Sequence, residues 1–542
     1  MNRLVVILFA GSLLSQSTNI DTILISNQDL SEKDFFNSSY KLERWFSSEG
    51  NSEGLSDVWL DRYLEPRDIN LMNYDDIMSL PSLSPIDANA VIKQKERGRI
   101  DGEFQLKNSP GITYYGYKNL KDFINFDTHG TNQFHLRYSS LVRTTPITTN
   151  PDSDESILLI DHSASNTPEH FHKISLSYMY GNNQSILKTG MLFSQHMGQS
   201  KDVYTFKKYA ELSYISLFKN LFQIDHFVIG NFTASFGQGV VFESTDYFSP
   251  RRSGYGFTKR NDGIRSDNTR SSQYVLNGFG LQLSNEFLRI IYFSSESPRD
   301  AILNEDGESF TCLISMQPRQ AWGINNDSTK IYSSLISSVN ERTAGFNARL
   351  GKGGNFIGGT YYRSLYDKFI IPMPIETILG SDDDDNPEYD VSDFDDYSGD
   401  AFYLSYITNS ADSEIEAMYQ SSPNNINSSW AEAKSYRHVV GIDFSTTIKN
   451  IVFQGEIARM PMSGDFISID NPQAMVINAY AQFDNINFLA LYRNYDLEFD
   501  NPYQRSFSNY QRYKTSIFED TYWLEDPIYG FLYSGNPQPQ AE

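Results

Sequence analysis

Basic side chains are concentrated in one segment of an otherwise acidic chain. The 542 residues carry 44 Lys and Arg against 68 Asp and Glu, which gives a net charge of −24. The basic segment directly follows a Phe-Gly-Gln-Gly strand expected at residues 236–239, and its cations are Arg251, Arg252, Lys259, Arg260, Arg265 and Arg270. Fixed cations in a narrow passage attract anions, so this loop could constrict a pore. An exposed loop neutralised by its own Asp262 and Asp267 is the alternative.

Two further clusters contain residue types that bind metal ions. Residues 382–400 are rich in Asp and Glu, whose oxygens suit calcium, but their spacing is not that of a known calcium loop. A solvated acidic loop is the favoured interpretation. His170 and His172 would lie on one side of a strand, as zinc ligands can, yet no third ligand is identifiable. The sequence therefore predicts neither a metal nor a cofactor.

Motifs of familiar active sites are missing from the sequence. A lipase-type hydrolase needs a serine and a histidine joined by an orienting acid or amide, and no local motif marks such a set. There is no phosphate loop of the Gly-Lys-Thr type and no dinucleotide fingerprint. We expect no catalytic residues, with a barrel hydrolase as the second alternative.

A short helical module precedes the basic segment. Asn73 is a good helix cap, and the two aspartates after its neighbour stand where the helix dipole favours negative charge. The first helix is therefore expected over residues 74–79. A second helix should begin at Pro85, which costs no hydrogen bond in a first turn, and end at Gly98. A final helix is expected over residues 114–124.

This module resembles the tandem helix-hairpin-helix domain of bacterial competence-type DNA receptors. The segment Ile69-Asn70-Leu71-Met72-Asn73 matches the opening of that domain, and two hairpin turns follow it. In the family, hairpin glycines let the backbone donate amide hydrogen bonds to a DNA phosphate without base specificity. The resemblance implies DNA or phosphate contact by Ser82, Leu83, Ser84, Lys93, Lys95, Arg97, Arg99, Gly111, Ile112 and Thr113.

The chain departs from the family pattern at both turns. Ser82 and Ser84 stand where the family has glycines, and the second hairpin keeps only Gly111. Serine amides and hydroxyls can bind phosphate, but serine is less suited to positive φ. The alternative is a module that docks another envelope protein.

The N-terminus has the pattern of a secretion signal. A positive start at Arg3, an apolar run over residues 4–14 and small residues suited to cleavage predict a signal peptide over residues 1–17. The run is too short for a membrane anchor. The only cysteine is Cys312, so no lipoprotein anchor is expected. Residues 18–66 would form a linker or helical segment before the helix-hairpin-helix domain, which is expected over residues 67–127.

From about residue 130 the chain alternates apolar and polar residues with a period of two, as residues 134–138 and 174–178 illustrate. Outer-membrane barrels have this pattern because lipid-facing residues alternate with a polar lumen. A soluble β-sandwich is the alternative. The other strands are expected at residues 210–218, 222–228, 281–293, 356–362, 401–407, 415–419, 439–444, 451–457, 475–483 and 486–492.

A second resemblance favours the barrel. Residues 234–242, the basic segment and residues 279–301 are similar to a group of Gram-negative envelope proteins in which a helix-hairpin-helix domain precedes an outer-membrane-like barrel. The resemblance implies a mainly β fold, with an antiparallel barrel over residues 130–542 after a small all-α domain. No terminal strand closing on an aromatic residue is expected, so either closure would use internal strands or the barrel would be incomplete at its C-terminus.

The expected protein is therefore non-enzymatic and lies in the cell outer membrane, with its helical domain in the periplasm. Its expected role is DNA or anion binding, or transport across that membrane. The first alternative is a periplasmic docking module on a passive pore or membrane anchor. The expected partners are outer-membrane lipid and either DNA, bound without sequence preference, or a periplasmic envelope protein.

Overall fold

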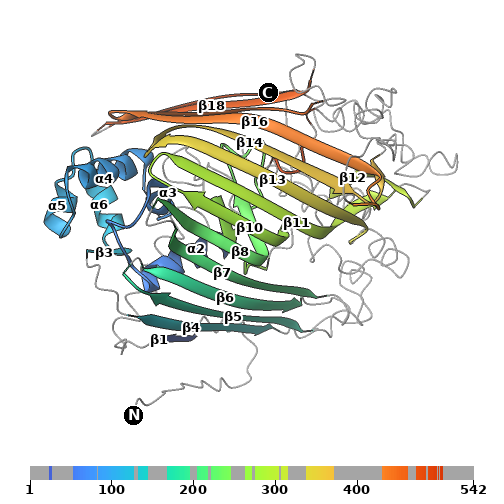
Figure 1. The fold of residues 1–542 in the computed structure, drawn as a ribbon, viewed down its shortest axis with the longest axis horizontal. Coiled ribbons are helices and arrows are strands. Elements are labelled where there is room, and N and C mark those ends of the chain that lie inside the picture. The colour runs from blue at the N-terminus through green and yellow to red at the C-terminus, as the bar shows by residue number, and fades with distance from the viewer. Residues whose placement is uncertain are drawn as a thin grey trace, which may run out of the picture.

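The computed structural model shows a mainly β protein with a small helical module (Figure 1). It describes residues 23–26, 53–81, 83–126, 132–143, 168–182, 184–195, 204–217, 221–245, 263–270, 275–303, 307–314, 337–370, 430–461, 471–483, 486–496, 499 and 501–504.

One large antiparallel sheet dominates the fold, and each strand pairs with the next one named. In this order the strands are β1 (Ile23–Ser26), β4 (Gln133–Arg143), β5 (Glu169–Tyr180), β6 (Ser185–Gln195), β7 (Thr205–Leu217), β8 (Phe222–Ser235), β10 (Leu276–Ser284), β11 (Leu288–Leu303), β13 (Val339–Lys352), β14 (Asn355–Tyr366), β16 (Ser435–Ile448), β17 (Ile451–Arg459), β18 (Gln473–Gln482) and β19 (Asn487–Tyr495).

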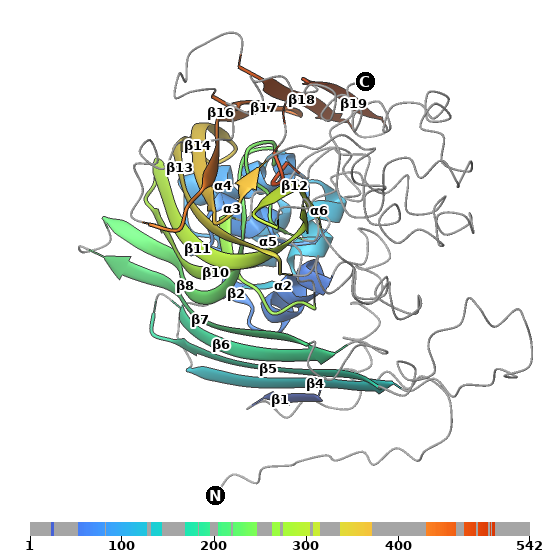
Figure 2. The same ribbon diagram turned by 90° about the vertical axis from the view of Figure 1, so that its right-hand side faces the viewer.

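Three shorter strands extend this sheet. Strand β9 (Gly263–Ser266) pairs with β8, β12 (Ser309–Ile314) pairs with β11, and β15 (Phe369–Ile370) pairs in parallel with β12. The sheet curves around the helices, with β1 and β19 far apart at its two ends (Figure 2). Within the part of the chain described, the large antiparallel sheet does not close into a barrel.

The helical module lies on the concave side of the sheet and beyond one end of its strands (Figures 1 and 2). Its helices are α2 (Glu53–Leu64), α3 (Tyr74–Met78), α4 (Pro85–Arg97), α5 (Glu103–Lys107) and α6 (Tyr114–Leu120). Two short strands, β2 (Arg67–Asp68) and β3 (Ile124–Asn125), pair in parallel and bring the segment before α3 next to the segment after α6. None of the described helices is long and apolar enough to cross a bilayer.

The module has a hydrophobic core of its own. Trp59, Ile77, Val91, Leu106 and Phe123 are fully buried within it. Apolar side chains from all parts of the module thus leave water together, which is the main favourable contribution to its folding.

Local signals in the module gave correct helix starts. Asn73 caps α3 by accepting from the Asp76 amide at 2.8 Å, and Pro85 stands at the start of α4, with Gly98 at its C-cap. These predictions are confirmed. The final helix ends at Leu120, earlier than predicted, because the chain turns there to place β3 against β2.

Most strand predictions are confirmed, with three corrections. Residues 281–293 form two strands, because the side chain of Asn285 accepts from the amide of Leu288 at 2.7 Å and stabilises a turn between β10 and β11. Strands β1, β6, β9, β12, β13 and β15 were not predicted. The predictions at residues 401–407 and 415–419 lie outside the described residues.

The third correction concerns residues 236–239, which were predicted as a strand. Strand β8 ends at Ser235, and the following residues 236–245, here called the inner loop, turn at Gly237 with a φ of 53°. Amides of Gln238 and Val240 donate to the carboxylate of Glu456 on β17 at 2.6 and 2.9 Å. A Cβ on Gly237 would lie 2.6 Å from that carboxylate, so the turn requires glycine.

The inner loop completes a second hydrophobic core inside the curved sheet. Phe242 stacks on Tyr503 with ring centroids 4.2 Å apart, and its ring also meets Phe293 at 4.8 Å and Tyr362 at 5.1 Å. All four side chains are fully buried. The concave side of the sheet therefore holds packed protein at two places, the helical module and the inner loop.

Candidate functional site where the helical module meets the sheet

The predicted phosphate donors of the two hairpins have an internal partner, the carboxylate of Asp87 on α4. The hydroxyl of Ser84 donates to Asp87 Oδ2 at 2.7 Å, and the amide and hydroxyl of Thr113 donate to Asp87 Oδ1, both at 2.8 Å. Asp87 is 1% exposed. One buried carboxylate thus accepts from the residues that start α4 and α6, where the resemblance places DNA phosphates.

The other hairpin residues have mixed surroundings. Leu83 is buried in the core of the module, Gly111 is exposed with a φ of 93°, and Ile112 is partly buried. Ser82 lies outside the described residues. An exposed glycine at positive φ is the one feature of the family hairpin that this chain keeps.

The four basic residues after the first hairpin do not form one patch. Lys93 and Arg97 are exposed, whereas Arg99 pairs with Asp68 at 3.2 Å. Lys95 donates to a backbone carbonyl, and burial lowers the pKa of its amine to about 8. Lys95 therefore has a structural role in the module.

We expect Asp87→Ala to destabilise the helical module by about 1–3 kcal/mol, because two helix starts lose their shared acceptor. Chemical unfolding followed by helical circular dichroism measures the change. Asp101→Ala is the matched control, because that carboxylate is exposed and pairs with Arg99 at the surface. Equal unfolding midpoints for the two variants would contradict the structural role of Asp87.

The predicted lumen constriction is only partly covered by the structure. Arg251, Arg252, Lys259 and Arg260 lie outside the described residues. Arg265 lines a polar cavity on the concave side, and the guanidinium of Arg270 lies 5.2 Å from the centre of the Phe171 ring. Asp267, proposed to neutralise the loop, pairs with Lys207 at 2.5 Å.

Charged residues of the module meet buried polar or charged groups of the sheet in three places, which we call the Asp76, Asp61 and Asp75 clusters. In the Asp76 cluster, the carboxylate pairs with Arg62 and Arg67, both at 3.1 Å. The hydroxyl of Tyr214 on β7 donates to it at 2.6 Å. Burial would raise the pKa of Asp76, but Arg67 and Arg62 outweigh burial and hold it well below its usual range.

Tyr214 reaches the module because the backbone of β7 is irregular there, with a φ of 61°. Its neighbours keep their register with β8, at Ser213 with His226 and at Ile215 with Ile224. Ser213 and Tyr214 both line the cavity on the concave side, so two successive side chains point inward. The guanidinium carbon of Arg67 lies 3.2 Å from the centre of the Tyr214 ring.

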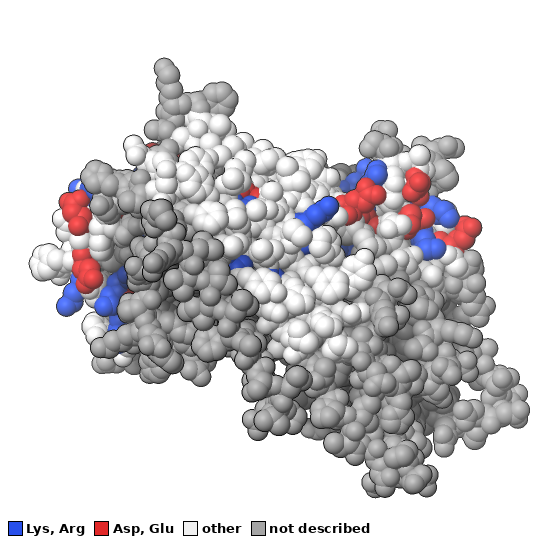
Figure 3. All heavy atoms as spheres, turned by 90° about the horizontal axis from the view of Figure 1, so that it is seen from below, with Lys and Arg blue, Asp and Glu red and all other residues white. Residues whose placement is uncertain are grey.

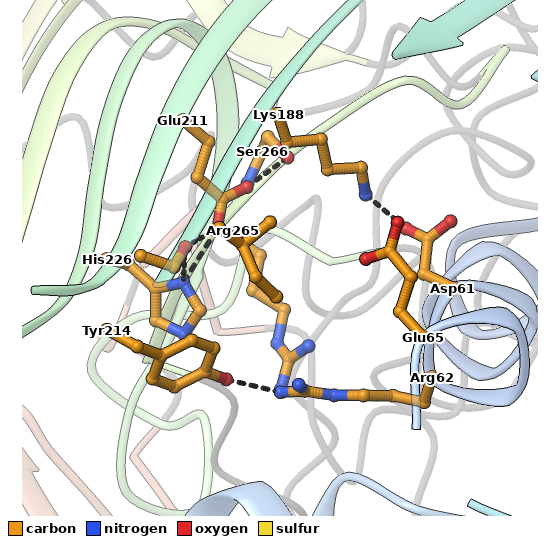
Figure 4. Close-up of a pocket in the computed structure, with 11 residues that line it drawn as sticks. Asp61, Arg62, Glu65, Lys188, Glu211, Tyr214, His226, Arg265 and Ser266 are labelled. Atoms are coloured by element: carbon orange, nitrogen blue, oxygen red, sulfur yellow. Dashed lines mark hydrogen bonds and ion pairs between the residues drawn. The ribbon is translucent and has the colours of Figure 1, made fainter. Parts of the chain in front are cut away.

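The Asp61 cluster joins α2 to the wall of the sheet beside the polar cavity (Figure 4). Arg137 on β4 pairs with Asp61 Oδ1 at 2.7 Å, and Lys188 on β6 pairs with Oδ2. The cavity has a volume of about 70 Å³ and lies between α2 and strands β6 to β9. Glu65 and Glu211 also line it.

The Asp75 cluster lies on α3 and the middle of the sheet. Asp75 pairs with Arg289 on β11 and with Arg349 on β13, the latter at 3.3 Å. A second carboxylate, Asp443 on β16, lies 3.9 Å from Arg349. Together the three clusters attach the module to strands from β4 to β13.

The cavity also brings together a serine, a histidine and an acid, the set that a barrel hydrolase would need. Glu211 Oε1 lies 2.7 Å from His226 Nδ1, and the hydroxyl of Ser213 lies 3.3 Å from the same nitrogen. In a catalytic triad the acid and the nucleophile meet opposite ring nitrogens. This arrangement cannot pass a proton from serine to histidine in the usual way.

Metal-binding residues do not gather in the described part of the chain, where no group of three His, Cys, Asp or Glu side chains is placed to hold an ion. His170 and His172 lie on β5 with ring centroids 6.2 Å apart. His172 Nδ1 is within hydrogen-bonding distance of the hydroxyls of Tyr138 and Ser140.

Comparison of the chain with protein-family models, curated proteins and solved structures finds no significant match.

Proposed function

We propose that this chain is an outer-membrane β-protein whose sheet faces lipid on its convex side and whose helical module closes its interior. One observation carries the proposal, which is the inverted distribution of apolar and charged residues across the sheet. In a soluble sheet, charged side chains face water and apolar ones are buried. A membrane sheet with a polar interior has the opposite pattern.

Strands β13 and β16 illustrate the inversion. Arg349 on β13 is buried and pairs with the module, whereas its neighbour Leu350 is 60% exposed. On β16 Asp443 is buried, and Ile442 beside it is 60% exposed. Successive residues of a strand point to opposite faces, so these apolar side chains point away from the module. The same outward set includes Phe134, Ile174, Met191, Phe206, Ile229, Phe279, Tyr292, Phe346, Ile357, Phe453 and Ile457.

The surface supports the same proposal. Charged side chains gather near the two ends of the molecule in Figure 3, and the described surface between them is mostly uncharged. A lipid-facing band between two polar rims has this appearance. The soluble β-sandwich needs a second sheet over the apolar face. In the described residues, the only other sheet is the pair β2 and β3 inside the module.

The contents of the concave side favour a closed interior over a passive pore. The module is held there by the Asp76, Asp61 and Asp75 clusters, and the inner loop is held by Glu456. Passage of a solute would therefore require the module to leave the sheet. In this proposal the helical side faces the periplasm, where the module can meet a partner.

Extraction and gel mobility test the location. We expect the protein to sediment with outer membranes, to resist carbonate, and to migrate faster on a gel when unheated, because a folded membrane sheet resists SDS. The unheated form should lose its fast mobility on boiling. Recovery of folded protein from the periplasm without detergent would contradict the proposal.

DNA or phosphate contact by the hairpins stays a prediction. If Ser84 and Thr113 are the donors, Asp87→Ala should free them, and the folded variant in detergent should retard duplex DNA in a salt-dependent way. The wild type should then bind more weakly, because Asp87 occupies these donors. Absence of any shift at low salt for both proteins would leave partner docking as the role of the module.

A further inference from the structure

Glu65 is a buried carboxyl group at the end of α2, beside the Asp61 cluster. Its amide donates to the carbonyl of Asp61 at 2.9 Å, so the two residues are one helical turn apart. Both carboxyls line the polar cavity, and Glu65 is 7% exposed. Two acids on one face of a helix thus enter the same enclosed space.

Two cations beside Glu65 are already committed to Asp61. Arg137 pairs with one carboxylate oxygen of Asp61, and Lys188 pairs with the other. Glu65 forms no ion pair within the described residues. A neutral carboxyl fits this position, whereas a charged one would be a second buried anion next to Asp61.

The remaining charged groups that line the cavity are Arg62 on α2, Glu211 on β7, His226 on β8 and Arg265 on β9. Arg62 pairs with Asp76 at 3.1 Å. Glu211 and His226 pair with each other at 2.7 Å. His226 therefore pairs with Glu211 and not with Glu65, and Glu211 is a further acid in the cavity.

These surroundings change the proton affinity of Glu65 in a definite direction. Burial, and then the charge of Asp61, raise the pKa of Glu65 to about 7. A carboxyl whose pKa is higher in the docked state than in free solution binds its proton more tightly when docked. Docking of α2 is then strongest in acid and weakens as the pH rises from about 4.5 to 7.

We propose that Glu65 is a proton-linked latch, which keeps α2 docked on the wall of the sheet when it is neutral and loosens α2 when it is charged. The latch rests on the proposed function, since it regulates the release of the module that closes the interior. The ion pairs of Asp61 hold α2 on the sheet, and the charge of Glu65 changes the strength of that docking with pH.

Hydrogen exchange of α2 amides in the full-length protein tests the latch. After correction for intrinsic rates, we expect protection of α2 to fall roughly thirtyfold between pH 5.5 and pH 8.5, as linkage to this pKa requires. Glu65→Gln, a neutral mimic, should keep high protection at both pH values. Glu103→Gln is the matched control, because Glu103 is exposed on α5, and it should behave as the wild type.

Two results would overturn the latch. One is equal protection of wild-type α2 at both pH values, which requires no variant to fold. The other is a Glu65→Gln protein with the pH dependence of the wild type. Gel mobility of the same samples separates this failure from failure of the proposed function. Heat-modifiable protein with flat protection removes only the latch, and protein without heat-modifiability removes the membrane location.

Discussion

Replacing Ile442 and Ile457 together with arginine is expected to prevent insertion of the protein into the outer membrane. The two side chains are direct partners across β16 and β17 and are 60% and 44% exposed on the convex face. Arginine on the lipid face of a membrane sheet costs about 2–4 kcal/mol near the bilayer midplane. The double variant should lose heat-modifiable mobility and be recovered in the periplasmic or degraded fraction.

The matched control is the double variant Asn340→Arg and Asn355→Arg, which places the same charges at exposed positions at the two ends of β13 and β14. It should insert normally, because charges near the membrane interface cost about 0–1 kcal/mol. Normal insertion of the Ile442 and Ile457 variant, or greater solubility without detergent, would favour the soluble β-sandwich instead.

Asp76→Ala is expected to release the helical module from the sheet. It leaves Arg62 and Arg67 buried without the carboxylate that pairs with both, and removal of one partner from a buried ion pair costs about 3–5 kcal/mol. Protease added to the periplasmic side should cleave the module of this variant and spare that of the wild type. The sheet should stay heat-modifiable, because its strand pairing does not involve Asp76.

Asp101→Asn is the control for this experiment, since Asp101 is exposed and lies outside the contact with the sheet. Its module should resist protease as the wild type does. Equal resistance of the Asp76→Ala variant would show that the Asp76 cluster does not hold the module in place. The Asp61 and Asp75 clusters would then be sufficient.

Features that depend on neighbouring residues could be predicted from the sequence. The cap at Asn73 and the first-turn Pro85 act within four residues, and the strand at residues 451–457 has a clear period of two. The turn at Asn285 was missed, because the apolar run around it resembles one long strand. Local patterns therefore predicted most elements, but they predicted the hairpin of β10 and β11 as a single strand.

Features that depend on distant residues could not be predicted. Nothing in the sequence near Tyr214 indicates its positive φ, and its partner Asp76 is 138 residues away. Asp87 was also missed, because its acceptor role at Thr113 requires the folded module. One signal was available in the sequence. Arg137, Arg289 and Arg349 alternate with apolar residues along their strands. Charged residues on one face of a strand indicate that their partners lie on that side of the sheet.

The place of the helical module in the chain has a consequence for assembly. The module precedes nearly all of the sheet and has its own buried core, so it can fold before most strands have pairing partners. Asp61 and Asp75 would then pair with cations that are synthesised later, from Arg137 on β4 to Arg349 on β13. The sheet would then form around a module that is already folded. Each strand would then be positioned by a contact to the module as well as by the strand before it.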